Sequence, residues 1–285
     1  MASGTATNRT NITLPAEYSQ EVLQKTTEAS AIMQLARKIT LPGPGAAIPV
    51  ISSDPTAQWV AETAKKPVAN PGVSTKVMTP YKLAVIVPFS NEFRRDANVL
   101  YEALVERLPN ALAAKFDETV IGGSTPGTGF DVLASCQTQD ISYAGFVEAM
   151  EDIASHGGNM DGIILSPAGK AEVLGQTDTT RRPLFNTVAD GAIGNILGAK
   201  TLTEKAAHIA GTCDGVAGDW TQAMYGTVEG VKIDISDQAT LTAGTQEAPV
   251  QINLFQQNMF AVRAEIEVGF VADTSCFNLL TVAES

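Results

Sequence analysis

The two histidines are the first residues to consider, because histidine is the usual acid–base and metal-binding group near neutral pH. Neither His156 nor His208 has a second metal ligand three or four residues further along the chain. His156 follows a predicted helix and precedes two glycines, where the helix dipole favours a cation. An isolated histidine rarely acts as a catalytic base without an orienting partner. We therefore predict a helix-capping role for His156 and no metal site.

Carboxylates that are adjacent in the sequence offer a second possible chemistry. The pairs Asp117-Glu118 and Glu151-Asp152 both fall within predicted helices. Adjacent helical residues point about 100° apart, so the two carboxylates of a pair do not converge on one substrate atom. We predict that these pairs lie on solvated helix faces. The sequence leaves open the possibility of an active site assembled from carboxylates that are far apart in the chain.

The glycine-rich run GGSTPGTGF, from Gly122 to Phe130, has the composition of a phosphate-binding loop. Such a loop needs Lys followed by Ser or Thr after its last glycine, and it lies between a strand and a helix. This run lacks the lysine and follows a predicted helix. The pattern indicates a helix end and a turn. With no catalytic or cofactor motif in the sequence, we predict that the protein is not an enzyme and needs no cofactor.

The overall charge limits the range of partners. The chain has 19 basic and 31 acidic residues, a net charge of −12, which opposes tight binding of nucleic acid phosphates. No stretch is long and apolar enough to form a membrane helix. Three widely spaced cysteines, Cys136, Cys213 and Cys276, are expected to be reduced core residues. These features suit a soluble protein made in a reducing cytoplasm.

The first part of the chain alternates between helical and extended segments. Residues 1 to 13 are polar and aperiodic, which predicts an N-terminal arm. A short helix follows, up to the proline and glycine cluster at residues 42 to 45. Residues 48 to 87 read as a long two-stranded hairpin with a polar tip. Because such a hairpin is marginally stable alone in water, it must lie on another surface, and that surface need not belong to the same chain.

A long helix and a compact unit come next. Asp96 can cap a helix that ends at Gly122-Gly123, and its apolar face repeats every fourth residue at Leu100, Leu104, Leu108, Leu112, Phe116 and Val120. Pro109 lies inside this pattern and should kink the helix or open its second half. Residues 135 to 240 have the alternation of a distinct α+β unit.

The segment QQNMFAVRAEIEVGF, from Gln256 to Phe270, alternates with the period of a β-strand. One face carries Phe260, Val262, Ala264, Ile266, Val268 and Phe270, and the other carries Arg263, Glu265 and Glu267. The apolar face needs a core. The charged face needs either solvent or a partner.

The order of these elements resembles the HK97-like family of phage major capsid proteins. The matching segments are AQWVAE at residues 57–62, VPFSNEF at 87–93, FDETVIGG at 116–123, DGIILSP at 161–167 and the strand that contains Arg263. Together they span residues 14 to 283, nearly the whole chain. Each segment is short, and the resemblance depends on their order and spacing.

The resemblance implies an α+β, HK97-like capsid fold in five parts. These are an N-terminal arm with a short helix (1–47), an extended hairpin loop (48–88), a peripheral domain with a long spine helix (89–134), an axial domain (135–240) and the C-terminal strands of the peripheral domain (241–285). It implies the major capsid protein of a tailed phage, made in the host cytoplasm and located in the virion. Pentamers and hexamers of this subunit would self-assemble into an icosahedral shell around double-stranded DNA, without sequence-specific DNA binding and with no membrane. A portal and a separate scaffold or decoration protein would be its other partners.

The resemblance also implies candidate contacts between subunits. They are Trp59, Glu62, Lys65 and Lys66 on the extended loop, and Arg263, Glu265 and Glu267 on the long strand. We expect the three strand charges to pair with opposite charges across the interface, or else to face solvent.

In some family members a loop lysine forms an isopeptide bond with an asparagine, assisted by a glutamate. Here Lys65 or Lys66 would be the nucleophile, with Asn258 and Glu265 at the other two positions. The simpler alternative is that both lysines are ordinary surface residues.

Two other functions stay open at this point. An encapsulin-type cellular compartment has the same fold but loads enzymes, and its gene neighbourhood would distinguish it from a phage. A soluble hydrolase with dispersed carboxylates would elute from a sizing column as a monomer or dimer.

Overall fold

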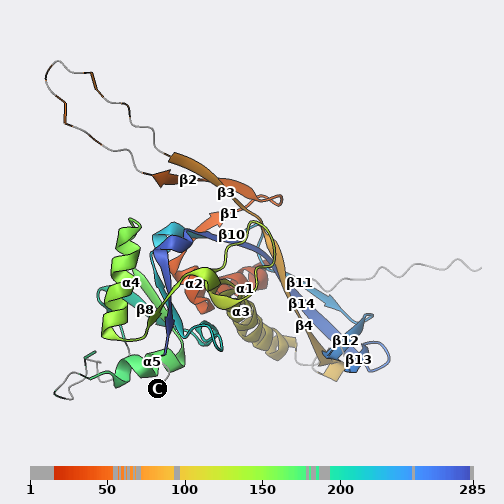
Figure 1. Cartoon of the computed structure of the whole chain (residues 1–285). Helices are drawn as coiled ribbons and strands as arrows, with labels where there is room; N and C mark the ends of the chain where they lie inside the picture. The colour runs from red at the N-terminus through yellow and green to blue at the C-terminus, as the bar shows by residue number, and fades with distance from the viewer. Residues whose placement is uncertain are drawn as a thin grey trace, which may run out of the picture.

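The computed structural model describes residues 16–53, 57, 59, 60, 62, 65, 66, 68, 72–92, 97–177, 180, 184, 185, 193–245 and 248–282. Within this part of the chain, a five-stranded and a six-stranded sheet pack against the long helix α3 (Ala97–Gly122). A separate two-stranded hairpin projects from the body (Figure 1). The combination of helices and sheets confirms the predicted α+β class.

The helix α3 is continuous through Pro109, which is buried, so its second half does not open. The described members of its predicted apolar face, Leu108, Leu112, Phe116 and Val120, are each at most 2% exposed. The predicted cap, Asp96, lies outside the described residues. Helix α1 (Ala16–Ala29) packs along α3, and Ser30 separates it from the short helix α2 (Ala31–Leu35).

The five-stranded sheet is built around one long strand, β14 (Met259–Ala272). On one edge β14 pairs with β4 (Tyr81–Ser90), and on the other with β11 (Lys232–Ser236) and β10 (Ala223–Thr227), all antiparallel. Strand β1 (Arg37–Thr40) extends the sheet in parallel beyond β10. The apolar face predicted for this strand is confirmed, because its six members, Phe260, Val262, Ala264, Ile266, Val268 and Phe270, are at most 3% exposed.

The six-stranded sheet has the order β5 (Gln137–Asp140), β15 (Phe277–Thr281), β9 (Gly215–Gly218), β6 (Gly162–Leu165), β8 (Ala199–Thr203) and β7 (Asn195–Ile196). Helices α4 (Tyr143–Ser155) and α5 (Pro167–Gly175) pack against it. Single 3-10 turns connect its strands, including the turn of Lys205–Ala207 that contacts α3.

The strand pairings differ from the division predicted at residue 240. Strands β10 and β11 precede that residue but belong to the five-stranded sheet, whereas β15, near the C-terminus, lies in the centre of the six-stranded sheet. The reason is that β15 is buried on both faces between β5 and β9, a position that its apolar sequence FNLLT suits. The two sheets are therefore tied together by the chain passing from β14 to β15.

The projecting hairpin consists of β2 (Ala46–Ser53) and β3 (Gly72–Met78), paired only with each other among the described strands. The predicted exit strand is divided at Thr79-Pro80, so that its second part, β4, joins the five-stranded sheet. A second two-stranded sheet, β12 (Thr240–Thr245) and β13 (Ala248–Asn253), extends from the opposite end of the body (Figure 1). Among the described residues, no helix is both long and apolar enough to span a membrane.

Candidate inter-subunit interface

The described tip residues of the β2–β3 hairpin are all exposed. Trp59 is fully exposed, Val68 is 84% exposed and Val60 is 38% exposed. The interface candidates Glu62, Lys65 and Lys66 are exposed beside them. Burying a large apolar side chain contributes roughly 1.5–3 kcal/mol, so leaving several of them in water favours a partner surface.

The root of the same hairpin is buried. Gly226 of β10 and Gly269 of β14 lie opposite each other, and Met78 fills the hollow above them with no exposed surface. A Cβ atom on Gly269 would come within 2.8 Å of Met78 Cγ and 3.0 Å of the Thr79 carbonyl oxygen. Leu41 packs into the same hollow and is 2% exposed. Only glycine at both positions leaves room for the hairpin root to lie this close to the sheet.

The three strand charges have partners within the chain, and their pairing across an interface stays a prediction. Arg263 Nη2 donates to Asp234 Oδ2 at 2.6 Å, and its Nε lies 3.6 Å from Glu265 Oε2. Lys82 Nζ lies 3.2 Å from Glu267 Oε1. The cause is the strand register, which places Asp234 directly opposite Arg263 and Lys82 directly opposite Glu267. Sequence reasoning missed these partners because they come from β11 and β4, which are distant in the chain.

The proposed cross-linking residues lie in three separate places. Asn258 ends the turn before β14 with φ of 52°, and its Oδ1 accepts from Asn91 Nδ2 at 2.8 Å. Glu265 lies seven residues further along an extended strand, a separation of roughly 23 Å at about 3.3 Å per residue. Lys65 and Lys66 are exposed on the hairpin. An isopeptide site would therefore need Asn258 and Glu265 from different copies of the chain.

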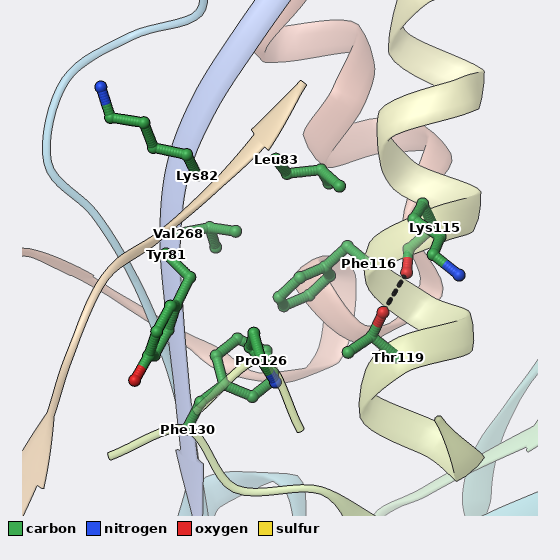
Figure 2. Close-up of a pocket in the computed structure, with 9 residues that line it drawn as sticks. All are labelled: Tyr81, Lys82, Leu83, Lys115, Phe116, Thr119, Pro126, Phe130 and Val268. Atoms are coloured by element: carbon green, nitrogen blue, oxygen red, sulfur yellow. Dashed lines mark hydrogen bonds between the residues drawn. The ribbon is translucent and has the colours of Figure 1, made fainter. Parts of the chain in front are cut away.

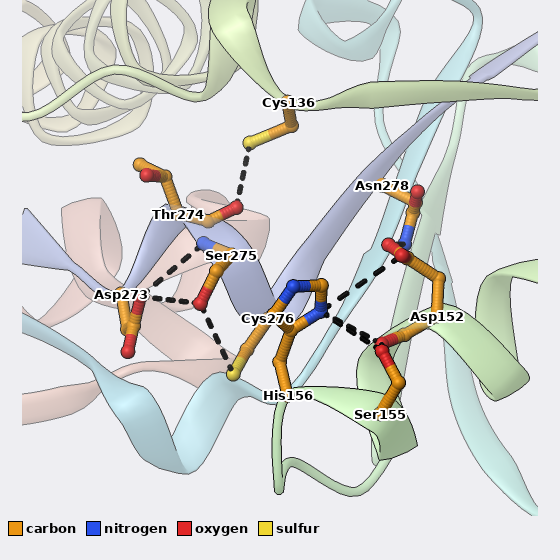
Figure 3. Close-up of polar contacts among 9 residues, drawn as sticks. All are labelled: Cys136, Asp152, Ser155, His156, Asp273, Thr274, Ser275, Cys276 and Asn278. Atoms are coloured by element: carbon orange, nitrogen blue, oxygen red, sulfur yellow. Dashed lines mark hydrogen bonds and ion pairs between the residues drawn. The ribbon is translucent and has the colours of Figure 1, made fainter. Parts of the chain in front are cut away.

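A cluster of His, Asp, Ser and Cys residues gathers at the end of α4 (Figure 3). His156 forms the C-cap, with its Nδ1 2.9 Å from the Asp152 carbonyl oxygen, which confirms the capping prediction. Asn278 Nδ2 donates to Asp152 Oδ2 at 3.0 Å. Burial raises the pKa of the Cys276 thiol, so the reactive thiolate is disfavoured. These contacts hold the helix end against β15.

The three cysteines are free thiols, as predicted, and two of them, Cys213 and Cys276, are buried. Cys136 is half-buried, and desolvation raises the pKa of its thiol to about 12. Desolvation likewise raises the pKa of Cys213 to about 11. Thiols with such high pKa values stay protonated at neutral pH.

A second group, Ser166, Asp214 and His208, contains the residue types of a hydrolase triad. Asp214 Oδ1 lies 2.7 Å from His208 Nδ1 and accepts from Ser166 Oγ at 3.1 Å. In a catalytic triad the histidine lies between the serine and the acid, whereas here the carboxylate does. Ser166 is fully buried, and its hydroxyl caps α5 by accepting from Gly169 N at 2.9 Å. The group therefore caps helix α5. Ser166 is far from its two other members in the sequence, so their spacing did not predict it.

Asp117 corrects the prediction of a solvated carboxylate pair. Its neighbour Glu118 is exposed, but Asp117 has no exposed surface. Ser30 Oγ donates to Asp117 Oδ1 at 2.5 Å, and the Ala31 N–H donates to Oδ2 at 2.8 Å. Burial raises the pKa of this carboxyl group to about 7. Asp117 faces inward because α2 packs its first turn against α3 at this point and needs an acceptor there.

A cavity of about 70 Å³ lies between β4, α3 and the glycine-rich loop (Figure 2). Three aromatic rings, from Tyr81, Phe116 and Phe130, line it, and the side chains of Leu83 and Val268 point into it. Sites for small ligands usually measure about 300–1,000 Å³, so this cavity is too small for a cofactor. Among the described residues, no group of three or more His, Cys, Asp or Glu side chains could hold a metal ion.

Comparison with known proteins gives the chain a family. The model described as the phage capsid family matches residues 10–281. A probable major capsid protein of Mycobacterium phage L5 is 28% identical over 281 residues, which cover 90% of this chain and 85% of that protein. The major capsid protein of Staphylococcus phage 80alpha is 24% identical over 284 residues, covering 95% of this chain and 86% of that protein.

Solved structures give the same result for the fold. A chain from Microbacterium phage Oxtober96 has a TM-score of 0.70 at 18% identity and covers 99% of this chain and 95% of its own length. A chain from Mycobacterium phage Cain has a TM-score of 0.68 at 20% identity, with coverage of 90% and 91%. The HK97-like fold predicted from the order of elements is thereby confirmed. The chain belongs to the phage capsid family.

Proposed function

We propose that this chain is the major capsid protein of a tailed phage and that many copies assemble into a closed icosahedral shell around double-stranded DNA. The observation that carries the proposal is the β2–β3 hairpin, whose root is buried in its own body while its described tip residues are exposed. Trp59, Val60 and Val68 are exposed in the described part of the chain, and a neighbouring copy can cover them.

The subunit acts as a building unit and not as a catalyst in this proposal. The polar clusters at His156 and Ser166 are used for helix caps, and the cysteine thiols have raised pKa values. The relatives named above are phage proteins, which favours a phage head over a cellular enzyme compartment. The net charge of −12 suits a wall that does not bind packaged DNA tightly.

The first test is the size of the purified full-length protein. We expect a megadalton species in size-exclusion chromatography and closed round particles in negative-stain electron microscopy. A stable species at the 29.9 kDa monomer mass, under conditions that span salt and protein concentration, would contradict the proposal. If the protein alone gives open or irregular sheets in place of closed particles, a separate scaffold or portal protein is needed to close the shell.

The second test concerns the tip of the hairpin. Trp59→Ser should reduce the yield of closed particles by about tenfold, because each contact loses most of the burial of a large aromatic ring. Phe255→Ser is the matched control, since Phe255 is also exposed, at 79%, but lies at the other end of the five-stranded sheet, beyond β13. Equal yields from the Trp59 variant and the wild type would remove the tip from the interface.

A further inference from the structure

The direction of the β2–β3 hairpin has to be fixed at its root. The two strands form a sheet of their own, and only Thr79 and Pro80 connect β3 to β4 in the body. Hydrogen bonds between β2 and β3 hold the strands to each other and not to the body. The contacts of the root, which comprises Leu41 before β2 and residues 76 to 81 around β3, therefore decide where the hairpin points.

Three of these root residues bind the loop Thr125–Asp131, the glycine-rich run that follows α3. The Thr79 N–H donates to the Gly129 carbonyl oxygen at 2.9 Å, and Tyr81 Oη donates to the Thr128 carbonyl oxygen at 2.8 Å. Lys76 Nζ donates to Asp131 Oδ2 at 3.1 Å. The same ammonium donates to the Ala272 carbonyl oxygen at 2.7 Å, so it also reaches the end of β14.

The loop is shaped to receive the hairpin root. Gly129 has φ of +82°, a conformation that favours glycine, and a Cβ there would lie 2.5 Å from Thr79 Oγ1 and 2.8 Å from the Val77 carbonyl oxygen. A Cβ on Gly127 would collide with the Tyr81 hydroxyl. The glycines of this run thus allow a close approach between two segments of the backbone, which explains a composition that the sequence alone associated with phosphate binding.

The loop is in turn anchored to the body. Phe130 is 6% exposed and makes edge contacts with the rings of Phe116 and Tyr81, at centroid distances of 6.4 and 6.2 Å. The Asp131 N–H donates to the Phe270 carbonyl oxygen at 2.9 Å, and Asp131 Oδ2 accepts from the Ala272 N–H at 3.1 Å. The cavity of Figure 2 lies beside Tyr81 and Phe130. Tyr81 is held by its ring contact with Phe130, by its strand pairing with Val268 and by its hydrogen bond to the loop.

We propose that the loop Thr125–Asp131 is a socket that helps to fix the direction of the β2–β3 hairpin, with Lys76 as a polar positioning residue beside the buried contact of Met78. The consequence for assembly rests on the proposed function: the angle at which one copy engages the next is set by this socket. Lys76 is suited to the role because one ammonium joins the hairpin, the loop after α3 and the crossing from β14 to β15.

The test measures the direction of the hairpin with spin labels at Thr75, which is exposed on β3, and at Lys232, which is exposed on β11. Labels are attached to genetically encoded amino acids so that the native cysteines remain, and labelled chains are diluted into unlabelled chains so that only distances within one copy are recorded. We expect Lys76→Met to broaden the distance distribution about twofold, because a freed root can swing as a hinge. Lys82→Met is the matched control, since it removes a lysine whose ammonium is paired with Glu267 on the adjacent strand and not with Asp131 of the socket.

Equal distributions for the Lys76 and Lys82 variants would overturn the proposal. Tyr81→Phe, which removes only the hydroxyl bonded to Thr128, provides a second variant that keeps the ring and should broaden the distribution by a smaller factor. A native-like circular dichroism spectrum is required of each variant. If the wild type forms no particles, the proposed function fails while the distance measurement still decides the socket. If particles form, the Lys76 variant should give a wider spread of particle diameters than the Lys82 variant.

Discussion

Two halves of one sheet face behave in opposite ways. On the outward face of β14, Gly269 and Val271 are covered by the hairpin root, with Met78 completely buried above them. A few residues earlier on the same face, Arg263 and Glu267 are left open and pair with charges on adjacent strands. The chain therefore covers one half of this face itself, and neutralises the other half.

The difference shows where this subunit is complete and where it is not. The covered half is closed by an apolar contact that requires two facing glycines. The charges of the other half are paired with residues on the same or adjacent strands of the same chain. The incomplete part is the described tip of the hairpin, where large apolar side chains are exposed. Variants in the two halves of the face should therefore have very different effects on the stability of one copy.

The largest effect should come from emptying the covered half. Met78→Ala should lower the free energy of unfolding by roughly 2–5 kcal/mol, since it leaves a cavity between the hairpin root and the sheet. Urea unfolding followed by fluorescence measures this loss. Val77→Ala is the control, because Val77 is the neighbouring strand residue and is 54% exposed. A similar loss of unfolding free energy for both variants would show that the packing of Met78 in the hollow does not stabilise the fold more than an exposed strand residue does.

The same contrast between covered and open groups applies to carboxylates. Burial raises the pKa of Asp117 to about 7, above its ordinary value of 3.8. The folded state therefore binds a proton that the unfolded state has released, and stability should fall by roughly 2–4 kcal/mol as the pH rises from 4 to 8. Asp117→Asn should remove most of this slope, as measured by urea unfolding across that range. Glu118→Gln, which changes the exposed neighbour, should keep it.

Adding volume to the covered half should have the next largest effect. Gly269→Val should cost roughly 1–3 kcal/mol, because its side chain would overlap Met78 and the Thr79 carbonyl group. Ala84→Val adds the same type of side chain to the open half, opposite Glu265, and should change stability little. Thermal unfolding of both variants makes the comparison. An equal loss would mean that the hairpin root is not closely packed.

The smallest effect should come from the charged half. Arg263→Gln should cost at most about 1 kcal/mol, because the pair with Asp234 is exposed to solvent and screened by salt. A double-mutant cycle with Asp234→Asn isolates the pair, and the coupling should shrink between low and high salt. A coupling of several kcal/mol would show that this face is shielded from water.

Sequence reasoning was most successful where a pattern is local. The alternation from Phe260 to Phe270 predicted a strand with one buried face. The apolar residue at every fourth position from Leu108 to Val120 predicted the buried face of α3. It was least successful where a contact joins distant segments. Asp117 was predicted to lie on a solvated helix face because the carboxylates of adjacent helical residues do not converge. Its hydrogen-bond partner in the core is Ser30, which is 87 residues away in sequence.

The glycine run after α3 shows both sides of this limit. The sequence correctly indicated a helix end and a turn. Because the run lacks the lysine of a phosphate-binding loop, the sequence also argued against a phosphate site. It gave no sign that the run would receive the hairpin root, because Lys76, Thr79 and Tyr81 precede it by about 50 residues and one long helix. The same applies to β15, whose place in the six-stranded sheet follows from pairing with β5 and β9.

The amino-acid sequence by itself determined the periodic elements, the acidic charge and the order of segments by which this chain resembles phage capsid proteins. These properties depend on neighbouring residues and on composition, which a linear reading contains in full. Only the tertiary structure decided which strands share a sheet, which charges are paired and which carboxylate is buried. Those outcomes depend on contacts between residues far apart in the chain, whose free energy appears only when the segments pack together.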